Sequence, residues 1–274
     1  MALINFLEFQ SIFQGAKTMA IVGSSDSVLR YSNGKCIDAC DLVVRFNRTK
    51  VDGLEDKVGS RTDILVVNDV NNLSKAPQVK ELSNPRVVVC FIDRVGFNKS
   101  ETHLKDFLDW VGDKDLFLCP RPDIAMIPVE KGTRSFSMGL YALGFLPYAL
   151  SIKELFVTGF TFFGSVEGGA AHYSKKASFS GSLWHDADME LLVARQILSE
   201  YPFNVSLTDE VYSVLKEPKK NIQLFGGELQ NKNAPKKSNL RLLANFFGYL
   251  LYKFTKVIMK STFLLRRFAE YLRS

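Results

Sequence analysis

Short apolar runs rich in β-branched residues recur along the first 160 residues of the chain. They are continuous rather than alternating, a pattern that is typical of strands buried on both faces of a sheet. Runs of this kind predict strands at 19–23, 41–46, 62–67, 86–92, 115–119 and 153–160.

Between several of these runs, apolar residues recur at helical spacing. This spacing predicts helices over 101–112 and 135–150. It predicts a third helix after His185, where the apolar residues that share one face are Met189, Val193 and Ile197. Strands that alternate with helices are typical of a parallel sheet with helices on both faces. We therefore expect an α/β fold built on a Rossmann-like, mostly parallel sheet.

A polar stretch with two prolines and a Gly-Gly pair, residues 216–239, is typical of a linker. It predicts a globular domain over 1–215 and a tail over 240–274. In the tail, one helical face carries Lys253, Lys256 and Lys260, and the other is apolar. Lysines within so apolar a window make a membrane-spanning helix costly, so a basic amphipathic helix at a membrane surface fits better. The alternative is a helix that packs on the globular domain.

The formal net charge of +6 is concentrated in this tail. From Lys236 to Ser274 the chain carries nine basic residues and one acidic residue, a net charge of +8. The rest carries 26 basic and 28 acidic residues, a net charge of −2. A basic tail on a nearly neutral body predicts an anionic membrane surface as a partner and no nucleic acid.

The cysteines and the N-terminal segment bear on the cellular compartment. The four cysteines form neither a C-x-x-C pair nor a zinc-like cluster with the three histidines, and nothing about them requires an oxidising compartment. The N-terminal segment has no basic region and carries Glu8 within its apolar stretch, unlike a signal peptide. We expect a cytoplasmic body, peripheral to the inner face of the cytoplasmic membrane.

Three segments carry candidate chemistry. The first predicted strand ends in a turn of small residues, Gly23–Ser27, where backbone amides could approach an anion. Ser137 and Gly139 lie near the start of a predicted helix, where hydroxyl and N–H donors could bind a phosphate. His172 follows a Gly-Gly loop and precedes His185 by 13 positions, so two of the three histidines fall beside one strand end.

Each of these features also has a purely structural interpretation. A glycine can serve only to make the turn, Ser137 only to cap its helix, and a loop histidine only to cover surface. Asp186 can cap the helix after His185 and leave this histidine exposed. The turn lacks the G-x-G-x-x-G fingerprint, so a nicotinamide-dependent enzyme has little support. No D-x-D pair follows a strand, so no metal is expected.

Together, four segments resemble the sialylmotifs of eukaryotic-type sialyltransferases. Residues 20–66 resemble the large motif, and the matching positions are Asp38, Asp41, Val43, Arg45, Asn47, Val58, Gly59, Ser60, Arg61 and Thr62. Residues 137–160 resemble the small motif, HYS at 172–174 the third motif, and HDADME at 185–190 the very small motif. All four occur in the family's order.

The resemblance implies a GT-A-variant fold and an inverting glycosyltransferase that transfers sialic acid from CMP-sialic acid to a glycan. It implies that His185 is the general base that accepts the proton of the acceptor hydroxyl. The donor site that it implies consists of Gly23, Ser24, Ser25, Asn47, Ser137, Gly139, Gly159 and His172. The expected acceptor is lipooligosaccharide, lipopolysaccharide or another membrane-linked glycan. No cofactor is expected, because N–H donors and positive charge would stabilise the departing CMP.

The chain departs from the family's pattern at several positions. Ser24 replaces an asparagine that contacts the donor, and Met138 replaces the threonine of S-T-G. The cysteine pair that joins the large and small motifs is absent, as is the N-terminal anchor, which is expected of a cytosolic, bacterial member. CMP-Kdo or another CMP-nonulosonate remains an alternative donor. The alternative of another class is a non-catalytic, nucleotide-binding peripheral membrane protein, although retention of both histidines favours catalysis.

Overall fold

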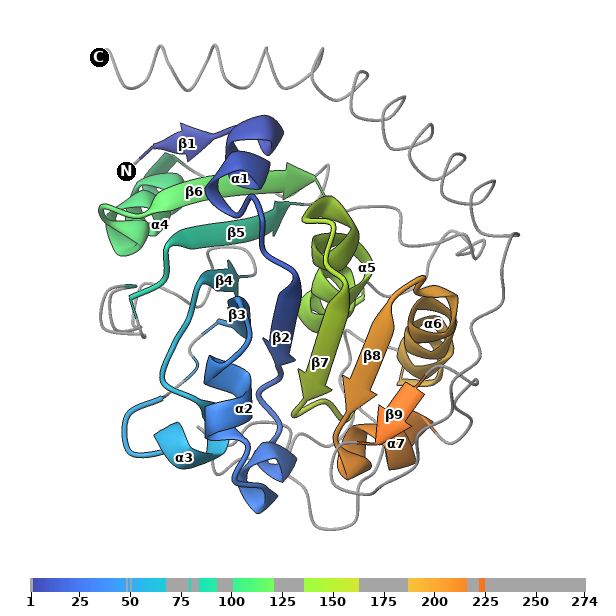
Figure 1. The fold of residues 1–274 in the computed structure, drawn as a ribbon. Helices are drawn as coiled ribbons and strands as arrows, with labels where there is room; N and C mark the ends of the chain where they lie inside the picture. The colour runs from blue at the N-terminus through green and yellow to red at the C-terminus, as the bar shows by residue number, and fades with distance from the viewer. Residues whose placement is uncertain are drawn as a thin grey trace. The chain divides into compact units, whose positions relative to one another are not determined.

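The computed structural model describes residues 2–47, 49, 51–67, 79, 84–92, 101–120, 136–162, 187–215 and 222–224. The chain divides into two compact units, Met1–Asn231 and Lys232–Ser274, and every described residue belongs to the first. The described strands form one nine-stranded sheet in which all neighbouring pairs are parallel (Figure 1). The predicted α/β fold with a mostly parallel sheet is confirmed.

The strand order across the sheet is β1-β6-β5-β4-β3-β2-β7-β8-β9. The strands are β1 (Leu3–Ile4), β2 (Thr18–Val22), β3 (Leu42–Phe46), β4 (Ile64–Val67), β5 (Val87–Ile92), β6 (Asp115–Pro120), β7 (Glu154–Thr158), β8 (Asn204–Leu207) and β9 (Ile222–Leu224). The helices are α1 (Phe6–Ile12), the 3₁₀ helix η1 (Asp26–Arg30), α2 (Gly34–Asp38), α3 (Glu55–Val58), α4 (Glu101–Val111), α5 (Met138–Ala149), α6 (Ala187–Glu200) and α7 (Asp209–Leu215).

The six predicted strands are β2 to β7, and the three predicted helices are α4, α5 and α6, so all of these predictions are confirmed. One predicted boundary is wrong. β9 lies within 216–239, the segment predicted to be a linker, but it pairs in parallel with β8, with Val205 opposite Ile222. A strand of three residues is too short to give a periodic signal. The globular part therefore extends past residue 215, whereas the predicted tail over 240–274 lies outside the described residues.

Helices cover both faces of the sheet. On one face, Ile37 of α2 and Val58 of α3 pack with strand residues of β2, β3 and β7, and α4 covers β4, β5 and β6. On the other face, Phe9 of α1 stacks on Phe117 of β6 at 4.6 Å between ring centroids, and Phe145 of α5 meets Phe91 of β5 at 6.0 Å. Burial on both faces explains why the strands read as continuous apolar runs.

The N-terminal segment is part of this fold. The side-chain oxygen of Asn5 accepts hydrogen bonds from the backbone N–H groups of Leu7 (2.9 Å) and Glu8 (3.0 Å). Glu8 in turn accepts one from the N–H of Asn5 at 2.7 Å, which completes a capping box. The acidic residue within the apolar stretch thus helps to cap the start of α1.

The order of the strands changes direction at β2. After β2 the chain adds β3, β4, β5 and β6 on one side, and then places β7 on the other side of β2 (Figure 1). Connections therefore leave the carboxyl ends of β2 and β7 in opposite directions. In open parallel sheets this arrangement creates the crevice in which ligands bind. The turns after β2 and β7 are thus the first place to look for a site.

Candidate functional site

The turns after β2 and β7 are in direct backbone contact. The N–H of Gly23 donates to the carbonyl oxygen of Thr158 at 2.8 Å, and the N–H of Ser25 donates to that of Gly159 at 3.1 Å. A Cβ atom on Gly23 would lie 2.1 Å from the Gly159 carbonyl oxygen, so only glycine fits there. Gly159 has φ +73°, in the left-handed region that favours glycine. Two predicted site glycines therefore join the two strand ends.

A third predicted glycine and Phe46, the residue before Asn47, lie against the ring of Phe160. A Cβ atom on Gly139 would lie 2.5 Å from Cε1 of the Phe160 ring, and one on Gly23 would lie 2.9 Å from its Cδ2. The ring also meets Phe46 edge-on at 5.7 Å between centroids, and Asn47 follows Phe46 at the end of β3 with φ 51°. Residues from three distant parts of the chain thus surround one buried aromatic ring.

The two serines of the first turn differ in exposure. Ser25 is buried and caps η1: its Oγ accepts hydrogen bonds from the N–H of Ser27 at 3.3 Å and from the Ser27 hydroxyl at 2.9 Å. Ser24 is half-buried between Gly23 and Ser25. The capping of Ser25 fixes the shape of the turn, and Ser24 has the more accessible side chain.

The start of α5 is fixed by Glu190 of α6. This carboxylate is fully buried and accepts hydrogen bonds from the N–H of Ser137 at 2.5 Å and from its hydroxyl at 2.9 Å. Ser137 Oγ accepts the N–H of Leu140 at 3.2 Å as the N-cap of α5. The first-turn N–H groups without an intrahelical acceptor are then those of Met138 and Gly139. Because Glu190 ends the HDADME segment, this contact joins two of the sequence motifs.

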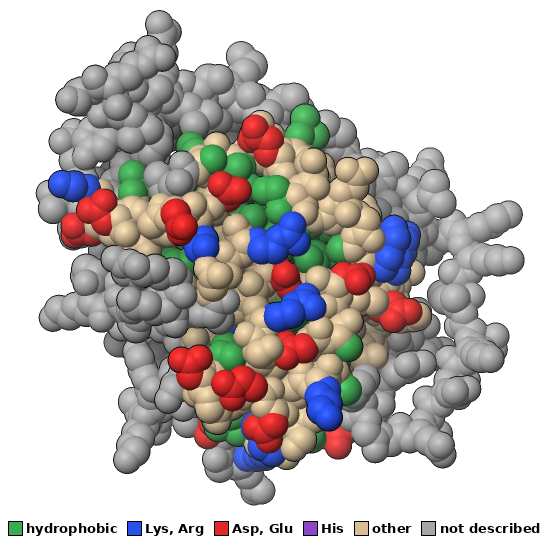
Figure 2. All heavy atoms as spheres, turned by 60° about the vertical axis from the view of Figure 1, so that its left-hand side comes forward, with side chains coloured by type: hydrophobic (Ala, Val, Ile, Leu, Met, Phe, Trp, Pro, Cys, Tyr) green, Lys and Arg blue, Asp and Glu red, His purple; other side chains and the backbone are tan. Residues whose placement is uncertain are grey.

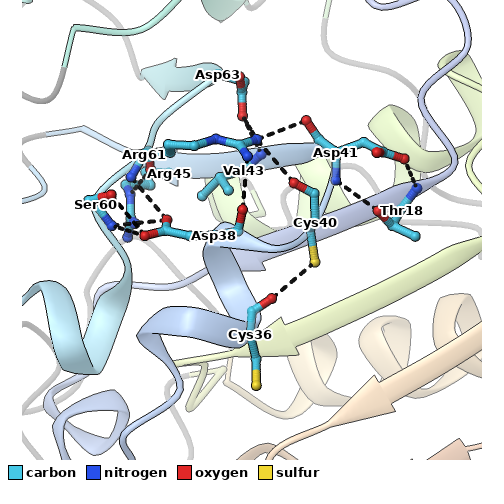
Figure 3. Close-up of polar contacts among 10 residues, drawn as sticks. All are labelled: Thr18, Cys36, Asp38, Cys40, Asp41, Val43, Arg45, Ser60, Arg61 and Asp63. Carbon is cyan, nitrogen blue, oxygen red and sulfur yellow. Dashed lines mark hydrogen bonds and ion pairs between the residues drawn. The ribbon is translucent and has the colours of Figure 1, made fainter.

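The charged positions of the large motif form a separate cluster (Figure 3). The Asp38 carboxylate accepts hydrogen bonds from the N–H of Ser60 (2.9 and 2.8 Å), from its hydroxyl (2.8 Å) and from the N–H of Arg61 (3.1 Å). Burial raises the pKa of Asp38, but these hydrogen bonds and the charge of Arg45 together lower it below the ordinary value. The cluster ties the segment after α3 to the end of α2.

Arg45 lies at the centre of this cluster and is fully buried. Its guanidinium donates to the carbonyl oxygens of Arg61 (2.9 Å), Val58 (2.5 Å) and Gly59 (3.1 Å). Arg61 in turn bonds the Asp63 carboxylate at 2.8 Å, and this ion pair raises the pKa of Arg61. A buried cation is costly unless acceptors surround it, and here backbone carbonyls supply them.

Two further acidic positions lie at the opposite edge of the sheet from the glycines. Asp41 precedes β3 and accepts hydrogen bonds from the N–H groups of Lys17 (2.7 Å) and Thr18 (2.9 Å), which lower its pKa. Asp63 precedes β4 and accepts the N–H of Val43 at 2.8 Å. Both lie at amino ends of parallel strands, away from the crevice. We call Asp38, Asp41, Arg45, Ser60, Arg61 and Asp63 the motif lock, because they hold the fold.

The two histidines predicted to act on the substrates, His172 and His185, lie outside the described residues. α6 is described from Ala187, two positions after His185. Their roles therefore stay predictions. Sequence reasoning missed two residues that the structure brings to the site, Phe160 and Glu210. Oε1 of Glu210 accepts the N–H of Gly159 from 51 positions away, a distance at which no local pattern gives a signal.

The described part of the chain shows no metal site. Within it, no group of three His, Cys, Asp or Glu side chains is placed to hold a metal ion. All four cysteines are free thiols, and burial together with the charge of Asp41 raises the pKa of Cys40 to about 11. Figure 2 shows acidic and basic side chains interspersed over the described surface of one face. None of the described helices has the length and apolar character needed to cross a membrane.

The fold is that of a sialyltransferase. The crystal structure of the monofunctional alpha-2,3-sialyltransferase Cst-I from Campylobacter jejuni superposes with a TM-score of 0.52 at 15% sequence identity, and covers 94% of this chain and 98% of that one. At this identity the likeness concerns the fold alone.

The sequence comparisons match part of the chain to one family. Residues 8–95 match the family model of glycosyltransferase family 29 (sialyltransferase). Beta-galactoside alpha-2,6-sialyltransferase 2 of Takifugu rubripes is 42% identical over 52 residues, 19% of this chain and 10% of the relative. Beta-1,6-galactosyltransferase GALT29A of Arabidopsis thaliana is 41% identical over 49 residues, 18% of this chain and 12% of the relative. The matched segments thus span about a tenth of each relative's length, and the predicted resemblance to the sialyltransferase family is confirmed.

Proposed function

We propose that this chain is an inverting glycosyltransferase that transfers sialic acid from CMP-sialic acid to a glycan acceptor. The observation that carries the proposal is the convergence of Gly23, Gly139 and Gly159 on Phe160 at the crevice between β2 and β7. Gly139 brings the first turn of α5, with the N–H groups of Met138 and Gly139, to this crevice, which suits a phosphate group. The match of residues 8–95 to glycosyltransferase family 29 supports the same class of donor.

The proposal assigns a role to each of the site residues. In this proposal Gly23–Ser25 and Asn47 hold the nucleotide. The N–H of Gly139, in the first turn of α5, and the side chain of His172 contact the leaving phosphate. Ser137 contributes by fixing that first turn, because its own N–H and hydroxyl are both donated to Glu190.

The proposed reaction exchanges one bond at the anomeric carbon of the sugar. The acceptor oxygen bonds to that carbon from the face opposite the phosphate, and CMP leaves with the electron pair of the broken bond, so the configuration inverts. His185 accepts the proton of the acceptor hydroxyl, for which its imidazole must be neutral. Hydrogen-bond donors stabilise the developing charge on the phosphate, and no metal takes part.

We further propose that the tail brings the site to a lipid-linked acceptor such as lipooligosaccharide or lipopolysaccharide, at the inner face of the cytoplasmic membrane. Each basic residue near an anionic surface contributes on the order of 1 kcal/mol. Full-length protein with Lys253, Lys256 and Lys260 changed to glutamate is expected to stop sedimenting with anionic liposomes. Equal sedimentation of the variant and the wild type would overturn the membrane role.

A CMP-release assay tests the reaction. CMP-sialic acid and CMP-Kdo are each offered with lipooligosaccharide and with other glycolipids, and UDP-galactose serves as a control donor because one similar protein is named a galactosyltransferase. We expect acceptor-dependent release of CMP from CMP-sialic acid. Release from CMP-Kdo alone would replace the donor by its alternative, and CMP binding without release would favour the non-catalytic alternative. A chain that binds no CMP would refute the proposal.

A further inference from the structure

Glu210 is an acidic side chain buried directly beneath the crevice. It lies in α7 and is 4% exposed. Its Oε1 accepts hydrogen bonds from the N–H of Gly159 at 3.1 Å and from the Thr158 hydroxyl at 3.4 Å. Its Oε2 is also buried. A carboxylate is costly to bury, so the burial of Glu210 beside the carboxyl end of β7 needs an explanation.

The surroundings of Glu210 connect it to the turn that carries the proposed nucleotide contacts. Thr158 accepts a hydrogen bond from the Thr208 hydroxyl at 3.2 Å, and both threonines are fully buried. Gly159, whose N–H Glu210 binds, has its carbonyl oxygen against Gly23 and accepts the N–H of Ser25. The two hydrogen-bonding groups of Gly159 are thus held from opposite sides, by Glu210 below and by the β2 turn above.

A second segment after β2 also lies close to this acidic side chain. Tyr31 follows η1, the helix that begins at the end of the β2 turn. Burial raises the pKa of Tyr31 to about 12, and the negative charges of Glu210 and then Asp209 add to the effect. The segment after η1 therefore lies close to α7.

We propose that Glu210 is a positioning residue of the donor site. By holding the N–H of Gly159, it fixes the left-handed peptide that supports the Gly23–Ser25 turn, and thereby sets the shape of the turn that holds the nucleotide. This inference rests on the proposed function, since it concerns the same donor. Glu210 lies outside residues 8–95, the segment that matches the family model.

The test compares Glu210→Ala and Glu210→Gln with Glu154→Ala in the full-length chain. Glu154 is exposed at the amino end of β7, the opposite end of the strand from Gly159. For Glu210→Ala we expect CMP affinity to fall about tenfold, which corresponds to about 1.4 kcal/mol, and the KM for the sugar donor to rise in parallel at nearly constant kcat. Glu210→Gln keeps one acceptor oxygen and should lose less, whereas Glu154→Ala should bind CMP like the wild type.

Hydrogen exchange supplies a readout that does not depend on activity. Glu210→Ala is expected to speed exchange in peptides covering 158–162 and 23–28, but not in those covering β4 or β5. Loss of stability alone would lower the apparent kcat at an unchanged donor KM, because only the active fraction falls. Unchanged CMP affinity or unchanged exchange at 158–162 in both Glu210 variants would overturn the inference. A wild-type chain that binds no CMP would instead refute the proposed function and the donor-binding part of this inference with it.

Discussion

Replacing Gly159 with alanine tests the close contact between the two turns. The new Cβ atom would lie 2.7 Å from the carbonyl oxygen of Gly23 and 3.1 Å from its carbonyl carbon, both of them backbone atoms that cannot rotate away. The left-handed φ of +73° costs alanine about 1–2 kcal/mol, and forcing an extra methyl group into a packed site adds about 1–3 kcal/mol. We expect the free energy of unfolding to fall by about 2–5 kcal/mol. Urea titration measures this loss.

Gly53→Ala is the matched control, because it isolates the cost of the backbone conformation. Gly53 has φ +77°, but a Cβ atom there would meet nothing within 4 Å. Its replacement should therefore cost only the conformational share of about 1–2 kcal/mol and leave CMP affinity unchanged. Gly159→Ala should weaken CMP binding as well, since it pushes the β2 turn away. Equal losses of stability in the two variants would refute the argument that the turns are in tight backbone contact.

Three further predictions concern single side chains. Glu190→Ala should lower the free energy of unfolding by about 2–3 kcal/mol in urea titration, because the buried donors of Ser137 lose their acceptor. Glu200→Ala, at the exposed end of the same helix, should not lower it. Similar losses in the two variants would contradict this prediction. Asp38→Asn should destabilise the protein at neutral pH, and the difference should disappear as pH falls below about 3.9 and through the lowered pKa of Asp38. Unfolding measured against Asp52→Asn from about pH 3 to 7 checks this, and a difference independent of pH would be the contrary result. His185→Ala should abolish transfer while CMP affinity stays within a few-fold of the wild type, and turnover near wild type in this variant would exclude His185 as the base. Excess EDTA should leave wild-type transfer unchanged. Activity that is lost with EDTA and restored by Mg²⁺ would exclude a metal-free reaction.

The strands that could be predicted from the sequence are those buried on both faces. β2 to β7 have four to six residues each, most of them apolar, so a continuous run identifies them. β1 has two residues and β9 three, and β8 alternates between exposed and buried positions over only four. These short strands close the two ends of the sheet. Their pairing is decided by neighbouring strands rather than by their own composition, so no local pattern could indicate them.

The site shows a similar division. Glycines could be singled out as candidates because a turn after a buried strand is a local feature. What makes glycine necessary at 23 and 139 is contact with residues 159 and 160, which only the folded sheet brings near. The same holds for Glu190 and Glu210, whose partners lie 53 and 51 positions away. The acidic residue at the end of HDADME and Ser137 were both singled out in the sequence, but the contact between them was not predicted.

The matches and departures of the large and small motifs fall in different parts of the structure. The matching charged positions Asp38, Asp41, Arg45 and Arg61 belong to the motif lock, whose hydrogen bonds run to backbone groups of this same chain. Two of the departures, Ser24 and Met138, lie instead beside the crevice, at the β2 turn and in the first turn of α5. Replacing the buried Arg45 of this lock would leave buried backbone carbonyl groups without their donors. Residues that face a ligand can change whenever the ligand changes. The chain therefore keeps the charged positions that hold the fold, and two of its departures lie beside the crevice where we propose that the donor binds.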